Sequence, residues 1–224
     1  MFAVLFISFV VICLGTIAFL LLIGQQSNQS KSLMSVLGSG GHTHEMLTLV
    51  KSLIDNHDDE STTNDNETFG IKQINEIIFI ASNDDELSVD KLNETIPEWN
   101  KAMTQNSIKY HLHRIQRSRH VHQSYISSIW TTLISLYHSF KIILKIRPRI
   151  LLCNGPGVCI PVIIACRIIS NQTTIVFVES FCRTRSLSLT GKIVYHTKLA
   201  NHFMVQWPKL TDKYPRAKFI GLLV

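Results

Sequence analysis

Short apolar stretches alternate with helical patterns along most of this chain, and this alternation limits the fold more than any other feature. In the first unit, residues 33–37 are apolar as a buried strand is, a glycine turn follows, and Met46, Val50 and Ile54 share one helical face over 43–54. Further strands are expected at 74–81, 107–112, 150–153, 174–178, 202–205 and 218–221, and helices at 88–92, 125–146 and 158–169. The alternation predicts an α/β fold, a Rossmann-like parallel-sheet domain with ligands beyond the carboxyl ends of the strands.

The N-terminal 24 residues have the character of a transmembrane helix. Residues 2–24 carry only apolar or small side chains, no charged residue precedes Lys31, and the stretch is long enough to cross roughly 30 Å of hydrocarbon. A cleaved signal peptide is the alternative, but its basic n-region and shorter apolar core are missing. We expect a retained signal anchor over 1–24, a linker over 25–32 and one domain over 33–224, with a flexible polar loop at 55–68.

Several features bear on the compartment of this domain. Positive charge follows the expected anchor, which places the domain in the cytosol by the positive-inside rule. Glycosylation sequons would be used only in a lumenal domain, and they lie at Asn28, Asn66, Asn93 and Asn171. Four cysteines lie in apolar surroundings without metal-ligand spacing, so we expect buried thiols at Cys153, Cys159, Cys166 and Cys182. We also expect residues 150–169 to form a strand, a turn and a buried helix, because Pro161 and Arg167 argue against a second span.

Charge is distributed unevenly along the chain. From Lys101 onward there are eighteen Lys or Arg residues against two acids, whereas the first hundred residues carry four basic and fourteen acidic ones. The second half is therefore suited to an anionic partner. Nucleic acid is disfavoured for an anchored chain, which leaves anionic lipid or a phosphorylated substrate.

A glycine-rich turn follows the first strand and is a candidate phosphate site, formed by Gly38, Ser39, Gly40, Gly41, His42 and Thr43. A dinucleotide fingerprint needs a third glycine where Thr43 stands and an acid about twenty positions later, and the lysine of a Walker loop is also missing. Backbone N–H groups and the N-terminus of the following helix still favour an anion. A tight turn with a purely structural role is the alternative.

Two titratable residues are candidates for catalysis. His42 stands where the turn meets the helix, so it could act as a general base near a bound phosphate, or it could be a capping or packing histidine; His44 is expected to face solvent. Glu179 follows the strand at 174–178 and is followed by Arg183 and Arg185. An acid at that place is either a ligand or base in the cleft or part of a structural ion pair.

Two further segments bear on phosphate binding. Asn154, Gly155 and Gly157 belong to a second turn, which follows a strand as the first does and is expected at the same edge of the sheet. The segment 110–122 combines four histidines with three arginines, Arg114, Arg117 and Arg119. It is either an exposed basic loop or a contact for lipid head groups or a pyrophosphate. Its histidines lack supporting cysteines or carboxylates, so no metal and no cofactor is expected.

These motifs together resemble a known family. The segments SVLGSGGHTHEM, SNDDELSVDK, HRIQRSRHV, LLCNGPGVCIPV, VFVESFCRTRSLSLTGKI and FMVQWPKLTDKYPRAKFIGLLV look like the membrane-anchor subunits of the endoplasmic-reticulum UDP-N-acetylglucosamine (UDP-GlcNAc) transferase. The resemblance implies a role in adding the second GlcNAc to the dolichol-diphosphate acceptor. The chain is also similar to the acceptor half of the bacterial GT-B glycosyltransferase that makes the lipid-linked peptidoglycan precursor.

The resemblance carries expectations about partners and site residues. A separate soluble subunit would bind UDP-GlcNAc. This chain would then be an obligate subunit of an inverting transferase and inactive by itself. The transferase would lie on the cytosolic face of the endoplasmic reticulum. The acceptor-side loop of the family is matched by Gly38, Gly40, Gly41 and His42, and its acid after the strand is matched by Glu179. Residues 154–157 match the second loop, although their NGPG sequence departs from the longer glycine run of the bacterial enzyme.

The C-terminus is the expected contact with the partner subunit. It is unusually apolar for a free chain end and is formed by Phe219, Ile220, Leu222, Leu223 and Val224. Two other functions stay open from the sequence. One is a recruitment scaffold without an essential side chain, and the other is a membrane-tethered oxidoreductase that binds NAD(P) at the first turn.

Overall fold

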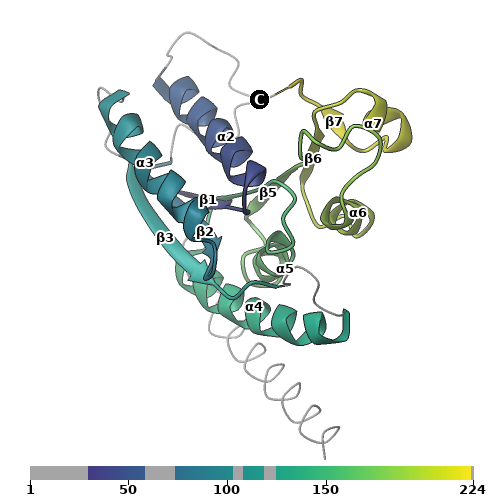
Figure 1. Cartoon of the computed structure of the whole chain (residues 1–224), viewed down its shortest axis with the longest axis horizontal. Helices are drawn as coiled ribbons and strands as arrows, with labels where there is room; N and C mark the ends of the chain where they lie inside the picture. The colour runs from purple at the N-terminus through teal and green to yellow at the C-terminus, as the bar shows by residue number, and fades with distance from the viewer. Residues whose placement is uncertain (1–29, 59–73, 103–107, 119–124, 223–224) are drawn as a thin grey trace, which may run out of the picture.

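A parallel sheet with helices on both faces forms the body of the protein (Figure 1). A computed structural model describes residues 30–58, 74–102, 108–118 and 125–222. The expected anchor at 1–24 lies outside these residues, as do most of the linker and most of the expected loop at 55–68. Among the helices that are described, none has both the length and the apolar character needed to cross a membrane.

Seven strands pair in the order β3-β2-β1-β4-β5-β6-β7, and every pairing is parallel. Their bounds are β1 Ser32–Val36, β2 Glu76–Ser82, β3 Lys109–Ile115, β4 Ile150–Cys153, β5 Thr174–Val178, β6 His202–Val205 and β7 Lys218–Phe219. The chain moves outward in one direction from β1 to β3 and in the other from β4 to β7. In open α/β sheets, ligands bind where the strand order reverses, which here is the boundary between β1 and β4.

The helices form one layer on each face of the sheet. Helices α2 (Gly41–Asp58) and α3 (Glu86–Ala102) pack on one face, and α4 (Tyr125–Ile146), α5 (Cys159–Ile169) and α6 (Leu189–His196) pack on the other. The short α7 (Lys209–Lys213) connects β6 to β7. Strand residues alternate between two apolar clusters: Met34 and Val36 of β1 face α4 and α5, whereas Leu33 faces α2 and α3. This two-layer burial confirms the expected fold class of the domain.

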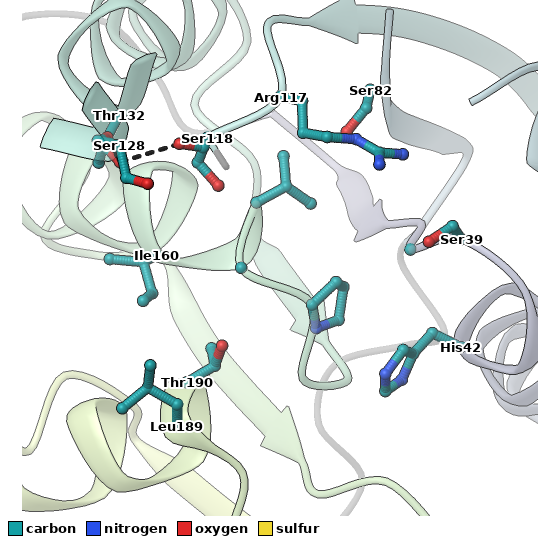
Figure 2. A pocket seen from close by; sticks show the side chains of 14 residues that line it. Ser39, His42, Ser82, Arg117, Ser118, Ser128, Thr132, Ile160, Leu189 and Thr190 are labelled. Carbon is teal, nitrogen blue, oxygen red and sulfur yellow. Dashed lines mark hydrogen bonds between the residues drawn. The ribbon is translucent and has the colours of Figure 1, made fainter. Parts of the chain in front are cut away.

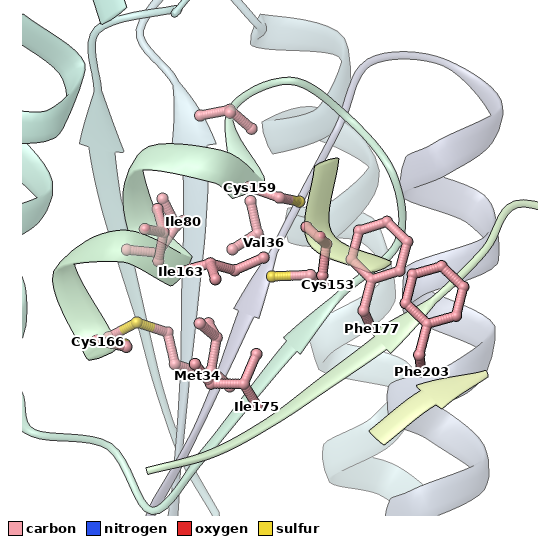
Figure 3. Packing of buried hydrophobic residues seen from close by; sticks show 14 of the residues in the cluster. Met34, Val36, Ile80, Cys153, Cys159, Ile163, Cys166, Ile175, Phe177 and Phe203 are labelled. Atoms are coloured by element: carbon pink, nitrogen blue, oxygen red, sulfur yellow. The ribbon is translucent and has the colours of Figure 1, made fainter. Parts of the chain in front are cut away.

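The core beneath α5 contains three of the cysteines (Figure 3). Cys153, Cys159 and Cys166 are buried free thiols, as expected, and burial raises the pKa of Cys166. Phe177 and Phe203 stack in the same cluster with ring centroids 5.0 Å apart. The expectation for Cys182 was wrong: it is exposed, because it lies in the loop after β5 and not in a core element.

Several helices differ from the sequence expectation. Helix α2 continues through the polar residues to Asp58, and α3 extends far beyond the expected residues 88–92. Its buried residues Val89, Leu92 and Trp99 keep one face on the core. Pro97 lies inside α3 but is exposed. Proline has no N–H to donate to the carbonyl of Asn93 four residues earlier, and Asn93 is also on the exposed side of the helix. Helices α6 and α7 were not anticipated, whereas residues 150–169 form a strand, a turn and a buried helix as expected.

Candidate functional site

A cavity of about 540 Å³ lies at the carboxyl edge of the sheet, where β1 and β4 are neighbours (Figure 2). Residues after β1, β3 and β4 and the last residue of β2 line it, together with the N-terminal parts of α4, α5 and α6. The lining residues are Gly38, Ser39, His42, Ser82, Arg117, Ser118, Ser128, Thr132, Pro156, Gly157, Val158, Ile160, Leu189 and Thr190. The cavity therefore lies at the position where this topology places ligands.

The two glycine turns are in direct contact. A Cβ atom on Gly38 would lie 2.5 Å from Cγ of Pro156, so only glycine lets the first turn pack this closely on the second. Gly155 has a φ of +104°, and a Cβ there would lie 3.4 Å from Cε1 of His42. Asn154 is buried, and its Nδ2 donates a hydrogen bond of 2.6 Å to the carbonyl of His42. The prediction that both turns share one edge of the sheet is confirmed.

His42 lies in the first turn of α2 and lines the cavity, whereas His44 faces solvent as expected. The Nδ1 atom of His42 lies 3.9 Å from Oε2 of Glu45, which is one turn further along the helix. Both atoms are buried, and neither has a hydrogen-bond partner within the described part of the chain. With Nδ1 directed at a carboxylate, Nε2 is the ring nitrogen left to act on a ligand.

Glu45 is a functional candidate that sequence reasoning missed. Its Oε1 accepts hydrogen bonds from Oγ of Ser180 (2.9 Å) and from the backbone N–H of Phe181 (3.2 Å). These contacts hold the carboxylate in place beneath His42 and join α2 to the loop after β5. The spacing of the two residues, three apart on a predicted helix, is the signal that could have found the pair.

Glu179 is fully buried at the end of β5. Its carboxylate accepts hydrogen bonds from the backbone N–H of Ser188 (3.0 Å), from the Ser188 hydroxyl (3.2 Å) and from the backbone N–H of Ser180 (3.1 Å). Burial raises the pKa of Glu179, and the hydrogen bonds from Ser188 oppose that rise. Gly191 of α6 packs so closely that an added Cβ would lie 2.0 Å from Oε2. Glu179 therefore positions the N-terminus of α6 at the cavity.

The two interpretations of Glu179 can be compared with these contacts. Among the described residues, no ion pair joins it to Arg183 or Arg185, both of which are exposed. Its Oε1 lies 3.8 Å from the position of a Cβ on Gly155, so the carboxylate is behind the second turn and does not line the cavity. Its observed contacts are structural, and its direct role in catalysis stays a prediction.

Thr43 supports the first turn from below. It is fully buried, and its hydroxyl hydrogen-bonds the carbonyl of Gly38 and, at 2.6 Å, the hydroxyl of Ser88 on α3. Its backbone N–H donates to the carbonyl of Gly40. With these groups engaged inside the protein, Thr43 is not carried into the proposed phosphate site, whereas Ser39 lines the cavity.

The three expected arginines are not equivalent. Arg117 lines the cavity, and its Nε lies 3.0 Å from Oδ1 of Asp84. Arg114 lies outside the cavity lining and forms a two-pronged ion pair with Glu86, with N–O distances of 2.5 and 2.8 Å. Arg119 falls outside the described residues. The described residues contain no group of three or more His, Cys, Asp or Glu that could hold a metal ion.

The C-terminal tail leaves large apolar side chains in solvent. Phe219 is 48% exposed and Leu222 57% exposed. Ile220 is partly buried and lines an apolar cavity of about 190 Å³ on the α2 side of the sheet, together with Leu53 and Met204. Leu223 and Val224, which complete the expected interface, lie outside the described residues.

Residues 33–223 match the family model described as "Oligosaccharide biosynthesis protein Alg14 like". The chain belongs to the Alg14-like family. The match covers the sheet, both glycine turns and the tail through Leu223, so the whole domain is included.

Three curated relatives of the Alg14-like chain, from mouse, human and Schizosaccharomyces pombe, are named "UDP-N-acetylglucosamine transferase subunit ALG14". The mouse protein is 38% identical over 203 residues, which cover 88% of this chain and 84% of the relative. The human protein is 36% identical with the same coverage, and that of Schizosaccharomyces pombe is 33% identical over 91% of this chain and 92% of its own.

Two proteins of known structure share the fold of the Alg14-like domain. MurG of Acinetobacter baumannii superposes with a TM-score of 0.53 at 12% identity, over 79% of this chain and 41% of MurG. A putative UDP-N-acetylglucosamine 2-epimerase from Listeria monocytogenes superposes with a TM-score of 0.52 at 13% identity, over 84% of this chain and 42% of that protein. The chain thus spans about two-fifths of each neighbour.

The Alg14-like domain brings together part of the predicted site. His42, Ser39 and Arg117 surround the cavity with the two turns, whereas Glu179 and Thr43 support it from within the protein. Hydroxyl-bearing residues that sequence reasoning missed complete the lining: Ser82, Ser118, Ser128, Thr132 and Thr190. Such hydroxyls can donate to phosphate oxygens or to sugar oxygens.

Proposed function

We propose that this chain is the membrane-anchored, acceptor-binding subunit of a heteromeric UDP-GlcNAc transferase, which adds the second GlcNAc to GlcNAc-diphosphodolichol in N-glycan precursor synthesis. The observation that carries the proposal is the match to transferase subunits over most of both chains. The chain spans only about two-fifths of MurG. A second chain, soluble and specific for UDP-GlcNAc, would therefore supply the other half of the active site.

The N-terminal segment would fix the domain at the membrane that holds the acceptor. Residues 2–24 are apolar and uncharged and of spanning length, and the basic residues follow them. In our proposal they form a single-pass anchor in the endoplasmic reticulum membrane, with the domain on the cytosolic face. The second subunit would be recruited to this face.

The cavity would bind the diphosphate and the first sugar of the acceptor. The N-terminus of α2, the two turns and Arg117 offer positive potential and backbone donors to the diphosphate. His42 would accept the proton of the acceptor hydroxyl at Nε2, with the Glu45 carboxylate 3.9 Å from Nδ1. The hydroxyl oxygen then bonds to the anomeric carbon, the bond from that carbon to the UDP oxygen breaks, and the anomeric configuration inverts. General-base catalysis of this kind is worth about 10² to 10⁴-fold in rate.

The proposal is tested by reconstitution of the two chains. GlcNAc transfer to a GlcNAc-diphosphate lipid is measured with this chain alone, with the candidate soluble subunit alone, and with both. Transfer is expected only with both chains. Transfer by the soluble subunit alone at the rate of the pair would contradict an acceptor-binding role.

A recruitment scaffold without an essential side chain is separated by point variants. In the assembled complex, Arg117→Ala is expected to raise the KM for the acceptor because a guanidinium at the diphosphate site is lost. A pure scaffold predicts unchanged kinetics with normal assembly. Titration with NAD(P) tests the alternative of an oxidoreductase. Our proposal expects that the chain does not bind NAD(P).

A further inference from the structure

The outward face of α4 exposes large apolar side chains in an ordered stripe. Leu133 and Ile134 both lie three or four residues from Trp130 and from Tyr137, so the four side chains share one side of the helix. Trp130 is 46% exposed and Tyr137 50% exposed, and the two aliphatic residues between them are partly exposed. The opposite side of α4 is already used, because Phe140 and its neighbours pack in the core with α5. A contiguous run of exposed apolar side chains rimmed by polar residues marks an interaction surface.

The stripe continues with positive charge. Lys141 and Lys145 follow on the same side of α4, both are exposed, and Nζ of Lys141 lies 5.8 Å from the ring centroid of Tyr137. The sequence of α4 contains no acidic residue. Aromatic and aliphatic side chains beside lysines are typical of a helix that lies in the head-group region of an anionic bilayer.

The position of α4 indicates which partner covers it. Ser30, the first described residue, donates to the carbonyl of Arg147 just after α4, from its backbone N–H at 3.1 Å and its hydroxyl at 3.3 Å. Only residues 25–30 separate this point from the proposed span, a reach of roughly 20 Å when extended. The other end of α4 carries Ser128 and Thr132, which line the cavity. The helix thus runs from the membrane tether to the acceptor cavity.

We propose that Trp130, Leu133, Ile134, Tyr137, Lys141 and Lys145, the α4 stripe, rest on the lipid bilayer and hold the cavity at the level of the head groups. A lipid-linked diphosphate then reaches the cavity without leaving the membrane. The nature of the acceptor rests on the proposed function, whereas the contact of the stripe with lipid does not.

Acceptor length separates membrane contact from chemistry in the full two-chain complex. The double variant Trp130→Ser/Tyr137→Ser is assayed with a long-chain lipid acceptor in vesicles and with a short-chain, water-soluble acceptor of the same head group. We expect the KM for the long-chain acceptor to rise about ten-fold or more, because two large apolar contacts with lipid are lost. The kinetics with the soluble acceptor stay at the wild-type level.

Two further variants serve as controls. Leu87→Ser removes an apolar side chain that is 74% exposed on α3, in the helix layer on the other face of the sheet, and is expected to change neither KM. Lys141→Glu/Lys145→Glu is expected to raise the long-chain KM in anionic vesicles but not in neutral ones. An unchanged long-chain KM in both double variants overturns the proposal, and so does an equal loss with both acceptors.

Fluorescence measures the contact without any transfer reaction. Brominated lipids are expected to quench the wild-type complex. Trp130→Phe is expected to remove most of that quenching, because Trp99 is buried in the core and Trp207 is partly buried, with its Nε1 donating to the carbonyl of Phe181. Quenching without GlcNAc transfer would refute the proposed function and leave the α4 stripe in place. Transfer without quenching, or loss of the soluble subunit from the Trp130→Ser/Tyr137→Ser variant, would assign the stripe to a protein partner and overturn the proposal.

Discussion

His42 and Glu45 give the first prediction at the level of single residues. In Glu45→Gln, the amide oxygen takes over the hydrogen bonds from Ser180 and Phe181, so the amide NH₂ group points to Nδ1 of His42. Nδ1 must then accept, the imidazole proton moves to Nε2, and the base is blocked. We expect kcat of the complex to fall about 100-fold with an unchanged KM for the acceptor.

The matched control for this change is Glu94→Gln, which neutralises an exposed carboxylate on α3. His42→Ala should lower kcat to a similar degree, because the proposed base is lost. Wild-type turnover in Glu45→Gln would show that Glu45 does not set the tautomer of His42.

Burial of Glu179 predicts a dependence of stability on pH. Because the pKa is raised in the folded protein, the folded state holds this proton more tightly than the unfolded state does. The stability that Glu179 contributes is complete below the ordinary value of 4.5 and is lost as the pH rises through the raised pKa. Glu179→Gln lacks this titration. The free energy of unfolding of the wild type, relative to the variant, should therefore increase as the pH falls from 7 towards 4.5.

Denaturant unfolding of both proteins at several pH values measures this difference. Subtracting the variant removes the titration of all other groups that the two proteins share. A difference that does not change with pH would mean that the pKa of Glu179 is the same in both states, in conflict with its burial.

At the level of elements, the C-terminal tail after β7 predicts how the two subunits associate. Deleting residues 222–224 removes the exposed Leu222 and the two apolar residues after it, and each such side chain is worth about 1.5 to 3 kcal/mol when buried at an interface. We expect the soluble subunit to be lost from co-purification while this chain stays folded. Adding three serines after Val224 is a control that keeps the apolar side chains, and retained binding by the deletion would contradict the prediction.

The sequence predicts a long apolar helix well, and it predicts the polar α3 and the short, capped helices poorly. Residues 125–146 form α4 as expected, because 22 residues provide several repeats of the helical period. Helix α6 has only eight residues and depends on Ser188, whose hydroxyl accepts from the N–H of Gly191 and donates to the buried Glu179. The turns could be found locally, but the contact between Gly38 and Pro156 depends on the pairing of β1 with β4, which local patterns do not contain.

At the level of the whole molecule, the proposed topology can be tested with the protein's own sequons. Asn93 on α3 and Asn171 after α5 are exposed, so the fold does not hide them from a glycosyl donor. A cytosolic domain predicts no glycan at either position, and endoglycosidase treatment of the wild type should leave its mobility on a gel unchanged. Replacing residues 1–24 by a cleavable signal peptide should deliver the same domain to the lumen and add glycans that Asn93→Gln and Asn171→Gln remove one by one. A glycan on Asn93 or Asn171 of the wild type would place the cavity on the lumenal side and contradict a shared site with a cytosolic subunit.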